Sequence, residues 1–364
     1  MKLFSSTPLV GLMVIGLPLM VSIGCKKSDS APPPTAPAVS TTALTNVTTS
    51  GATTGGTILT NGNATITQSG IVWSKTNAMP TLTDSVIAST ATNGSFTTNL
   101  TGLDFNRTYY IRAFATNSLG TGYGAVVTLN TTNDTSKVRF TYNGKEVIYG
   151  IIISPVTGKK WLDRDLGASQ VATAYNDYKA YGDFFQWGRP ADGHQLMNWT
   201  SSTSGTAVNG TTTVLATVDT PGHSNLIIPP NAAPWALDWR SDNNSNRWVT
   251  KPQGPCPTGW HVPKLTEWKS EIPTTAGGTA SSGGIANYND AFSKLKLTTA
   301  ALRISYEGGS YGSIGSYGAY WSSTDIYYSS YAISYAYYVV FSSGVVNLVN
   351  DGKSIAMPVR CMHD

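Results

Sequence analysis

Charged residues are scarce in this chain: Asp, Glu, Lys and Arg make up only 12% of its 364 residues. That is about half the share of an average soluble protein. The formal net charge is +4, and no run of basic residues is longer than two lysines. A nucleic-acid partner would require a dense basic patch, so we exclude that class of ligand. Leucine-rich heptads are also missing, which excludes a coiled coil.

Cysteine and histidine are rare as well. Three Cys and four His stand far apart, so the sequence offers no zinc-type ligand spacing and we expect no metal or cofactor. Aromatic residues, in contrast, are abundant, with ten Trp and nineteen Tyr. Their side chains supply enough apolar surface for a packed core and exclude a disordered polyelectrolyte. The length suits two or three domains.

The first 25 residues resemble the leader of a bacterial lipoprotein. An uncharged run from Pro8 to Gly24 is short for a membrane span and long enough for a signal peptide. The resemblance implies cleavage before Cys25 and lipidation of that residue, although Ser22 replaces the usual Leu. An ordinary secretory signal and an uncleaved anchor are the alternatives. We expect a protein held at the outer membrane by its lipid and exposed at the cell surface.

The assignment of Cys25 to lipidation also determines how the other two cysteines are interpreted. With Cys25 lipidated, Cys256 and Cys361 are an even pair in an oxidising compartment, and we expect a disulfide between them. Two buried free thiols are one alternative. A reactive Cys256 with His261, five residues further on, as its partner is another.

Residues 38–132 have the pattern of a β-sandwich, with short alternating apolar runs separated by turn residues. Trp73 is expected between the two sheets, and Gly120–Gly124 is expected to form the last hairpin. The predicted strands are Ala64–Thr67, Ser69–Ser74, Ser95–Leu100, Thr108–Thr116 and Ala125–Asn130.

The segment Leu103–Asn117 within that region resembles the strand E–F region of fibronectin type III domains. In that family a Tyr after the loop turns its hydroxyl back onto the backbone, and the resemblance gives this role to Tyr110. Such modules in secreted bacterial proteins are mostly spacers, which is the function we expect here.

From Lys137 onward the composition changes, and nine of the ten Trp lie beyond this point. Asn143-Gly144 predicts a hairpin between Val138–Tyr142 and Glu146–Ile153. Several separated motifs then follow in order: Lys160–Ala168, Tyr181–Arg189, Cys256–Pro263 with Glu267-Trp268, Tyr320–Thr324 and Val359–Cys361.

This series of motifs resembles the Fibrobacter succinogenes major paralogous domain, which is related to the C-type lectin-like fold. The resemblance implies a loop-rich α+β unit with two short helices, antiparallel strands and termini brought together. Candidate helices are Asp177–Gln186 and Leu265–Ile272. Lys264 is a poor N-cap for the second of these, so we expect that helix to begin late or to fray.

The expected fold class is therefore mixed, an all-β fibronectin-like sandwich followed by an α+β C-type lectin-like domain. The expected segments are a signal peptide, a Pro-rich linker, the sandwich and the lectin-like head, at residues 1–24, 25–37, 38–132 and 137–364.

Two polar motifs contain residue types that catalytic or metal sites use. Asp163-Arg164-Asp165 could be paired carboxylates, but neighbours in a strand point to opposite faces, so we expect a structural Arg–carboxylate link. The run Asp242–Asn246 has the oxygen spacing of a calcium loop. Arg247 stands where an EF-hand needs Gly, and the carbohydrate triplets of C-type lectins are missing, so calcium is kept only as an alternative.

Residues 306–350 are the most informative stretch, since 28 of these 45 positions are Tyr, Ser, Gly or Asn. Antibody paratopes use the same mixture for adaptable contacts. We hypothesise a ligand-contacting face, of the kind that a retroelement diversifies in some lectin-like surface proteins, made of Tyr311, Tyr317, Tyr327, Tyr328, Tyr331, Tyr335 and Asn347.

The alternative for this stretch is that many of these rings pack an ordinary β-meander. Its strands would be Ala332–Phe341, Val345–Val349 and Ile355–Arg360. Alternation along a strand allows both interpretations, with one set of rings inward and the other outward.

The function expected from the sequence is adhesion or recognition by a surface lipoprotein, whose head binds a glycan or a protein ligand. A structural envelope protein without a specific ligand is one alternative. The other is an enzyme like the formylglycine-generating relatives of the lectin-like fold, which use paired reactive thiols. We predict no catalytic residues.

Overall fold

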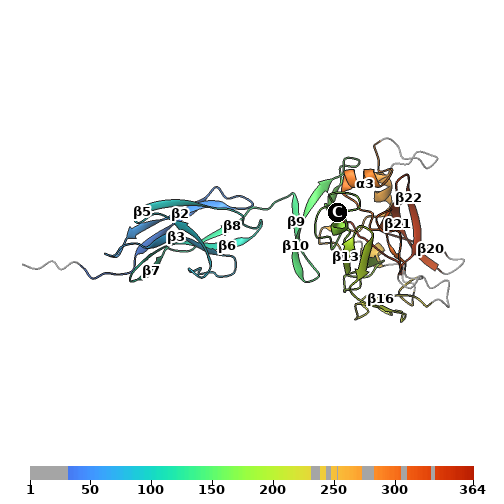
Figure 1. Ribbon diagram of the computed structural model, residues 1–364, viewed down its shortest axis with the longest axis horizontal. Helices are drawn as coiled ribbons and strands as arrows, with labels where there is room; N and C mark the ends of the chain where they lie inside the picture. Colours follow the sequence, from blue (N-terminus) through green and yellow to red (C-terminus); the bar gives the residue numbers. More distant parts are fainter. Residues whose placement is uncertain are drawn as a thin grey trace, which may run out of the picture. The chain divides into compact units, whose positions relative to one another are not determined.

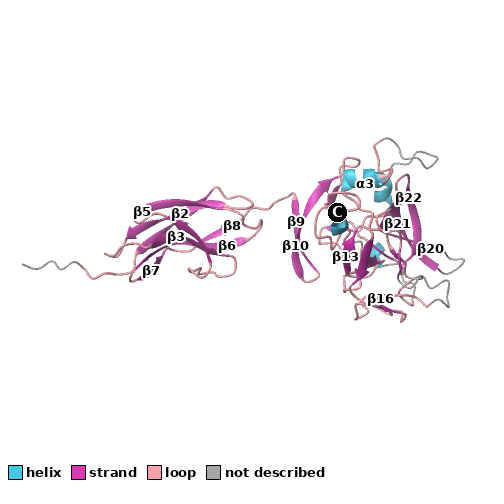
Figure 2. Ribbon diagram, in the orientation of Figure 1, coloured by secondary structure: helices cyan, strands magenta, loops and turns pink. Residues whose placement is uncertain are grey.

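The computed structural model describes residues 32–230, 238–242, 247–251, 253–272, 283–304, 310–328 and 333–364. Within these ranges the protein is mostly β, with several small sheets and a few short helices (Figures 1 and 2). The chain divides into two compact units, the first ending at Asn133 and the second beginning at Asp134. No helix among the described residues is long and apolar enough to cross a membrane.

The first unit is a sandwich of two antiparallel sheets. One sheet has the order β1-β2-β5, and the other has the order β4-β3-β6-β7, with β8 also paired to β6. This is a fibronectin type III-like arrangement. The strands are β1 (Ala38–Thr45), β2 (Ala52–Thr60), β3 (Gln68–Ser74), β4 (Ser85–Ser89), β5 (Gly94–Leu100), β6 (Thr108–Asn117), β7 (Gly120–Tyr123) and β8 (Val127–Asn130).

Four of the five predicted sandwich strands are confirmed, as β3, β5, β6 and β8, and the hairpin at Gly120 is formed by β6 and β7. The prediction of a strand at Ala64–Thr67 is wrong. Asn63 takes a left-handed φ of 60°, and Ile66 is the only large apolar residue between it and β3. Strands β1, β2 and β4 were not predicted, because their Thr, Ser and Gly residues leave no clear alternation of apolar and polar side chains. Trp73 packs edge-to-face on Tyr109 at 5.5 Å.

The corner tyrosine is Tyr109, and the assignment of that role to Tyr110 is wrong. The Tyr109 side chain is 2% exposed, and its hydroxyl accepts a hydrogen bond from the Asp104 backbone N–H at 2.8 Å. Tyr110 is half-buried and follows it in β6. Successive residues of a strand face opposite sides, so a shift of one position exchanges the inward and the outward ring.

The second unit opens with the predicted hairpin of β9 (Lys137–Tyr142) and β10 (Lys145–Ile153). Asn143 and Gly144 both take left-handed φ values, of 48° and 72°, as a two-residue hairpin turn requires. The sheet continues in the order β9-β10-β11-β24-β17, with β11 (Lys160–Leu162), β17 (Trp260–His261) and β24 (Met362–His363). The beginning and the end of this unit therefore share one sheet.

A three-stranded antiparallel sheet lies in the middle of the core of this unit. It consists of β20 (Gly318–Tyr328), β21 (Ile333–Phe341) and β22 (Val346–Gly352). Trp321 and Ala336 belong to the hydrophobic cluster on one face, whereas Tyr320 and Val339 belong to the cluster on the other. Both faces of the sheet are thus covered along most of its length.

The remaining strands form smaller sheets around that core. The expected third strand of the meander, at Ile355–Arg360, is wrong, because β23 leaves the sheet and pairs with β12 and β18. These sheets are β12-β23-β18-β19, β13-β14 and the parallel pair β15-β16. Their strands are β12 (Phe185–Gln186), β13 (Met197–Ser201), β14 (Ser204–Ala207), β15 (Thr211–Thr212), β16 (Leu226–Ile227), β18 (Arg303–Ile304), β19 (Ser310–Tyr311) and β23 (Ala356–Met357).

The helix predicted at Leu265–Ile272 is confirmed as α2 (Leu265–Glu271). It begins at its first residue and not late, because the Glu267 carboxylate accepts a hydrogen bond from the Lys264 N–H at 2.8 Å. That bond replaces the cap that the Lys264 side chain cannot provide.

The helix predicted at Asp177–Gln186 is wrong. Only one 3-10 turn forms there, η1 (Tyr178–Ala180), because Gly182 takes a left-handed φ of 69° and the chain beyond it is extended. Two helices were not predicted, α1 (Arg247–Thr250) and α3 (Tyr288–Leu295). The Asn287 side chain caps α3 by accepting hydrogen bonds from two backbone N–H groups.

Cys256 and Cys361 form the predicted disulfide, with a Cα–Cα distance of 5.8 Å. Both residues are buried in the same hydrophobic cluster as Trp248 and Trp260. The bridge therefore joins the loop before β17 to the segment before β24 inside the core.

Candidate functional site

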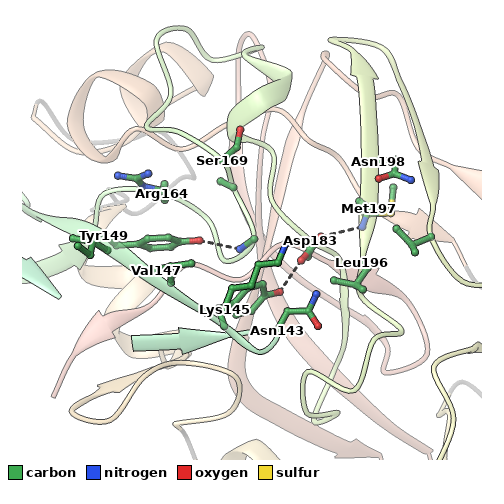
Figure 3. Close-up of a pocket in the computed structure, with 15 residues that line it drawn as sticks. Asn143, Lys145, Val147, Tyr149, Arg164, Ser169, Asp183, Leu196, Met197 and Asn198 are labelled. Atoms are coloured by element: carbon green, nitrogen blue, oxygen red, sulfur yellow. Dashed lines mark hydrogen bonds between the residues drawn. The ribbon is translucent and has the colours of Figure 1, made fainter. Parts of the chain in front are cut away.

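The second unit has an open cavity of about 630 Å³ beside its first hairpin. Figure 3 shows Lys145, Val147 and Tyr149 of β10 on one side of it, and Leu196 with Met197 and Asn198 of β13 on another. A cavity of this size falls within the range of small-molecule sites in proteins. Its full lining is Tyr142, Asn143, Lys145, Val147, Ile148, Tyr149, Arg164, Gly167, Ala168, Ser169, Asp183, Leu196, Met197, Asn198 and Val208.

Asp183 is the acidic residue that lines this cavity, and it is almost completely buried, with 5% exposure. Its carboxylate accepts one hydrogen bond from the Tyr142 hydroxyl at 2.7 Å and one from the Met197 backbone N–H at 2.9 Å (Figure 3). No described residue forms an ion pair with it. Burial outweighs the two hydrogen bonds and raises the pKa of Asp183 to about 6.

The Tyr149 side chain, which lines the cavity, is held in place by several contacts. Its hydroxyl accepts a hydrogen bond from the Gly167 N–H at 3.0 Å and donates one to the Asp165 carbonyl at 3.3 Å. The Arg164 guanidinium lies 4.8 Å from the centre of the Tyr149 ring and is bound to both oxygens of Asp163. Burial raises the pKa of Tyr149, so its hydroxyl stays protonated at physiological pH.

The rim of the cavity carries polar side chains with no hydrogen-bond partner among the described residues. These are the amides of Asn143 and Asn198 and the ammonium of Lys145, all three exposed. Apart from the Asn143-Gly144 turn, nothing in the sequence points to this cavity, because its lining comes from five separate segments of the chain.

The tyrosines predicted to contact a ligand do not form one surface. Tyr327, at 57% exposure, and Tyr328, at 39%, lie at the free end of the β20–β21 pair, together with half-buried Tyr335. We call these three residues the tyrosine end. Tyr328 packs edge-to-face on Tyr335 at 5.6 Å, while Tyr327 is in register with Ser334 and projects to the opposite face.

Other predicted contact residues lie elsewhere. Tyr317 and Asn347 are near the opposite end of the same sheet, where Gly318 pairs with Phe341 and Asn347 with Val340. Tyr311 is half-buried in β19, and its hydroxyl contacts the Met197 sulfur at 3.9 Å. Tyr331 and the predicted lipid-attachment residue Cys25 lie outside the described residues.

A buried polar cluster supports the tyrosine end from within. The Lys353 ammonium is fully buried, 3.0 Å from the Asp325 carboxylate and 2.5 Å from the Ser334 hydroxyl. It also lies 4.3 Å from the centre of the Trp187 ring. Lys353 therefore connects the ends of three adjacent strands, which fixes the position of the hairpin that carries the tyrosines.

The polar motifs considered in the sequence are structural where the structure describes them. Arg164 pairs with Asp163, as predicted, whereas Asp165 pairs with Arg360. Asp242 forms an ion pair with Arg240, and Asn243–Asn246 lie outside the described residues. Within the described ranges, no three His, Cys, Asp or Glu side chains are grouped so that they could hold a metal ion.

Comparison with known proteins gives only distant likenesses. No family model and no curated protein matches the chain. Among solved structures, the sensor domain of the anti-sigma factor RsgI4 from Pseudobacteroides cellulosolvens is 12% identical, over 29% of this chain and 100% of that chain, with a TM-score of 0.22.

Two further structures have similar scores. One described as a myokine is 18% identical, over 28% of this chain and 99% of that chain, with a TM-score of 0.21. A fragment of titin is also 18% identical, over 28% of this chain and 32% of that chain, with a TM-score of 0.20. These values are too low to indicate a function, so the fibronectin-like assignment rests on the strand order of the first unit.

Proposed function

We propose that this protein is a lipid-anchored surface protein whose second unit binds a glycan at its tyrosine end. In this proposal Cys25 carries the anchor, the fibronectin-like sandwich is a spacer, and residues 137–364 are a C-type lectin-like head of the Fibrobacter succinogenes major paralogous type. The single observation that carries the binding function is the exposure of Tyr328 beside Tyr335, at the end of an otherwise buried sheet.

Several features of the second unit support the lectin-like assignment. Its first and last segments share one sheet through β11 and β24. Short helices α2 and α3 flank strands that are almost all antiparallel. Antiparallel strands and termini brought together are properties that the sequence resemblance implies, and α2 is one of the two helices expected from it. The anchor is supported by the sequence alone.

A glycan fits the tyrosine end better than a protein does. Aromatic rings pack against the apolar C–H face of a sugar while their hydroxyls stay in water. Three rings of roughly 150–250 Å² each, only partly exposed, are much smaller than the roughly 800 Å² that one partner buries in a stable protein–protein interface. The exposed tyrosines of the described chain therefore suit a few sugar units.

Binding is also favoured over catalysis. Formylglycine-generating chemistry needs reactive thiols, but Cys256 and Cys361 are joined to each other and buried. A disulfided cysteine has no thiolate with which to attack a substrate. The structural-protein alternative differs from our proposal in having no ligand at all, so a binding experiment separates the two.

The proposal is tested by applying the full mature chain to a glycan array, with Cys25→Ser to prevent lipidation. Binding to a restricted set of glycans is expected. An absence of binding above background on a broad array would contradict the proposed function. The anchor is tested separately by intact-mass analysis of the membrane-extracted protein, which should begin at acylated Cys25. A chain that retains Met1, or one cleaved without lipid, would contradict it.

A further inference from the structure

The cavity beside the first hairpin contains a buried acid whose charge is not compensated. Among the described residues, Asp183 accepts hydrogen bonds from Tyr142 and Met197 only and forms no ion pair. A carboxylate can accept about four hydrogen bonds, so two of its positions are unused. Burying a charged carboxylate without enough hydrogen-bond partners is unfavourable. A ligand that donates hydrogen bonds to this carboxylate would supply the ones that the protein does not.

The charges around the cavity restrict what that ligand can be. The exposed ammonium of Lys145 lines the cavity and would repel a cationic ligand, whereas the Arg164 charge is paired with Asp163. An anionic ligand meets the Asp183 carboxylate at the bottom. A neutral molecule with several hydroxyl groups avoids both repulsions, since hydroxyls donate to a carboxylate and accept from an ammonium.

The other lining groups fit the same kind of molecule. The amides of Asn143 and Asn198 have no partner among the described residues, and each can donate and accept at the rim. Val147, Leu196 and Val208 supply apolar contacts. A volume of about 630 Å³ accommodates one or two sugar rings.

We propose that this cavity binds one neutral saccharide unit, with an uncharged sugar hydroxyl donating to the ionised Asp183 carboxylate and the amides of Asn143 and Asn198 contacting the ring substituents. This site is built from other residues than the tyrosine end, and it does not rest on the function proposed for that end.

The protonation state of Asp183 gives the proposal a distinctive pH dependence. A protonated carboxyl would itself donate, and it would lose half of its acceptor capacity. With a pKa of about 6, Asp183 is mostly ionised at pH 7 and mostly protonated at pH 5. Saccharide affinity should therefore fall about tenfold between these two pH values.

The two tyrosine hydroxyls that line the cavity stay protonated in that range. Burial raises the pKa of both facing hydroxyls, Tyr142 and Tyr149. A pH effect between 5 and 7 at this site therefore reports on Asp183.

The test uses the full mature chain with its methionine methyl groups labelled with ¹³C. Met197 lines the cavity, while Met357 and Met362 are buried elsewhere and serve as internal controls. The probes are methyl glycosides of glucose, galactose and mannose, titrated to about 50 mM. For each neutral sugar that binds, the corresponding amino sugar and uronic acid are titrated as charged analogues on the same ring.

The expected result is a saturable shift of the Met197 methyl signal with at least one neutral glycoside, weaker binding of both charged analogues, and the tenfold loss at pH 5. Asp183→Asn should weaken binding about 10–100-fold and remove the pH dependence. Tyr328→Ala should leave this binding unchanged, which separates the cavity from the tyrosine end.

Three results would overturn the proposal. They are no shift of Met197 with any neutral glycoside, tighter binding of a charged analogue, or unchanged affinity in Asp183→Asn. Should Asp183→Asn fail to fold, Asn198→Ala at the exposed rim provides a second variant. It should weaken binding, and wild-type affinity in that variant would equally contradict the proposed contacts.

Discussion

Arg360 and Asp165 form a fully buried ion pair with an N–O distance of 2.7 Å, although 195 residues separate them in the sequence. Arg360 also donates hydrogen bonds to the backbone carbonyls of Leu162, Leu295 and Lys296. One guanidinium therefore connects the last segment of the chain to β11 and to the end of α3.

Asp165→Asn should destabilise the second unit strongly, because it leaves the Arg360 charge buried without its counter-ion. The expected loss is about 3–5 kcal/mol in the free energy of unfolding, measured by urea denaturation. Lys294→Ala provides the control, since it breaks the more exposed Asp290–Lys294 pair of α3 and should cost less than about 1 kcal/mol. Similar losses in both variants would contradict the role assigned to the buried pair.

Tyr109→Phe should destabilise the first unit by about 1 kcal/mol, because the Asp104 N–H loses the hydroxyl that accepts its hydrogen bond. The neighbouring change Tyr110→Phe removes a hydroxyl from a ring on the other face of the strand and should have a smaller effect. Thermal unfolding of the two variants compares them directly. A larger loss for Tyr110→Phe would show that the corner was assigned to the wrong residue.

Reduction of the disulfide should lower the melting temperature of the second unit. Cys256 and Cys361 are 105 positions apart, and closing a loop of that length stabilises a fold by about 4–5 kcal/mol in the chain-entropy model. Cys256→Ser should melt lower than the oxidised wild type and should not respond to a reductant. If the reductant leaves the wild-type melting temperature unchanged, the bridge does not stabilise the fold.

Asp183 should make the stability of the second unit depend on pH. Its folded pKa of about 6 lies above the ordinary value of 3.8, so the folded state binds the proton more tightly than the unfolded state does. The resulting stabilisation is complete below about pH 3.8 and is lost as the pH rises through 6.

The measurement compares urea denaturation of the wild type and Asp183→Asn between pH 7 and pH 4. Relative to the variant, the wild type should gain up to roughly 3 kcal/mol as the pH falls. A difference between the two proteins that stays constant with pH would show that Asp183 titrates at its ordinary value.

Local signals in the sequence predicted local structure well. Asn143-Gly144 predicted the first hairpin, and short alternating apolar runs predicted β3, β5, β6 and β8. Elements that depend on distant partners were missed. Strand β1 is poor in large apolar residues and is held by its pairing with β2, and Thr41 accepts a hydrogen bond from Ala113 of β6.

Prediction of the candidate sites from the sequence is limited for the same reason. The tyrosine-rich stretch was visible in the sequence, but which rings are exposed depends on the pairing of β20 with β21 and on the clusters that cover both faces of the sheet. The cavity could not be predicted, because its lining comes from five separate segments, and Asp183 meets Tyr142 and Met197 only after the chain has folded. The helix predicted at Asp177–Gln186, which includes Asp183, also does not form.

The central claim, that the head recognises a glycan through its tyrosine end, is tested most directly by the affinity of single-ring variants for the strongest array glycan. Tyr328→Ala should weaken binding at least tenfold without changing the melting temperature, because an exposed ring contributes little to the fold. Tyr327→Ala shows whether the opposite face also takes part, and Val345→Ala, an exposed residue near the far end of the sheet, is the control. Equal affinity of the wild type and Tyr328→Ala for that glycan would contradict the claim.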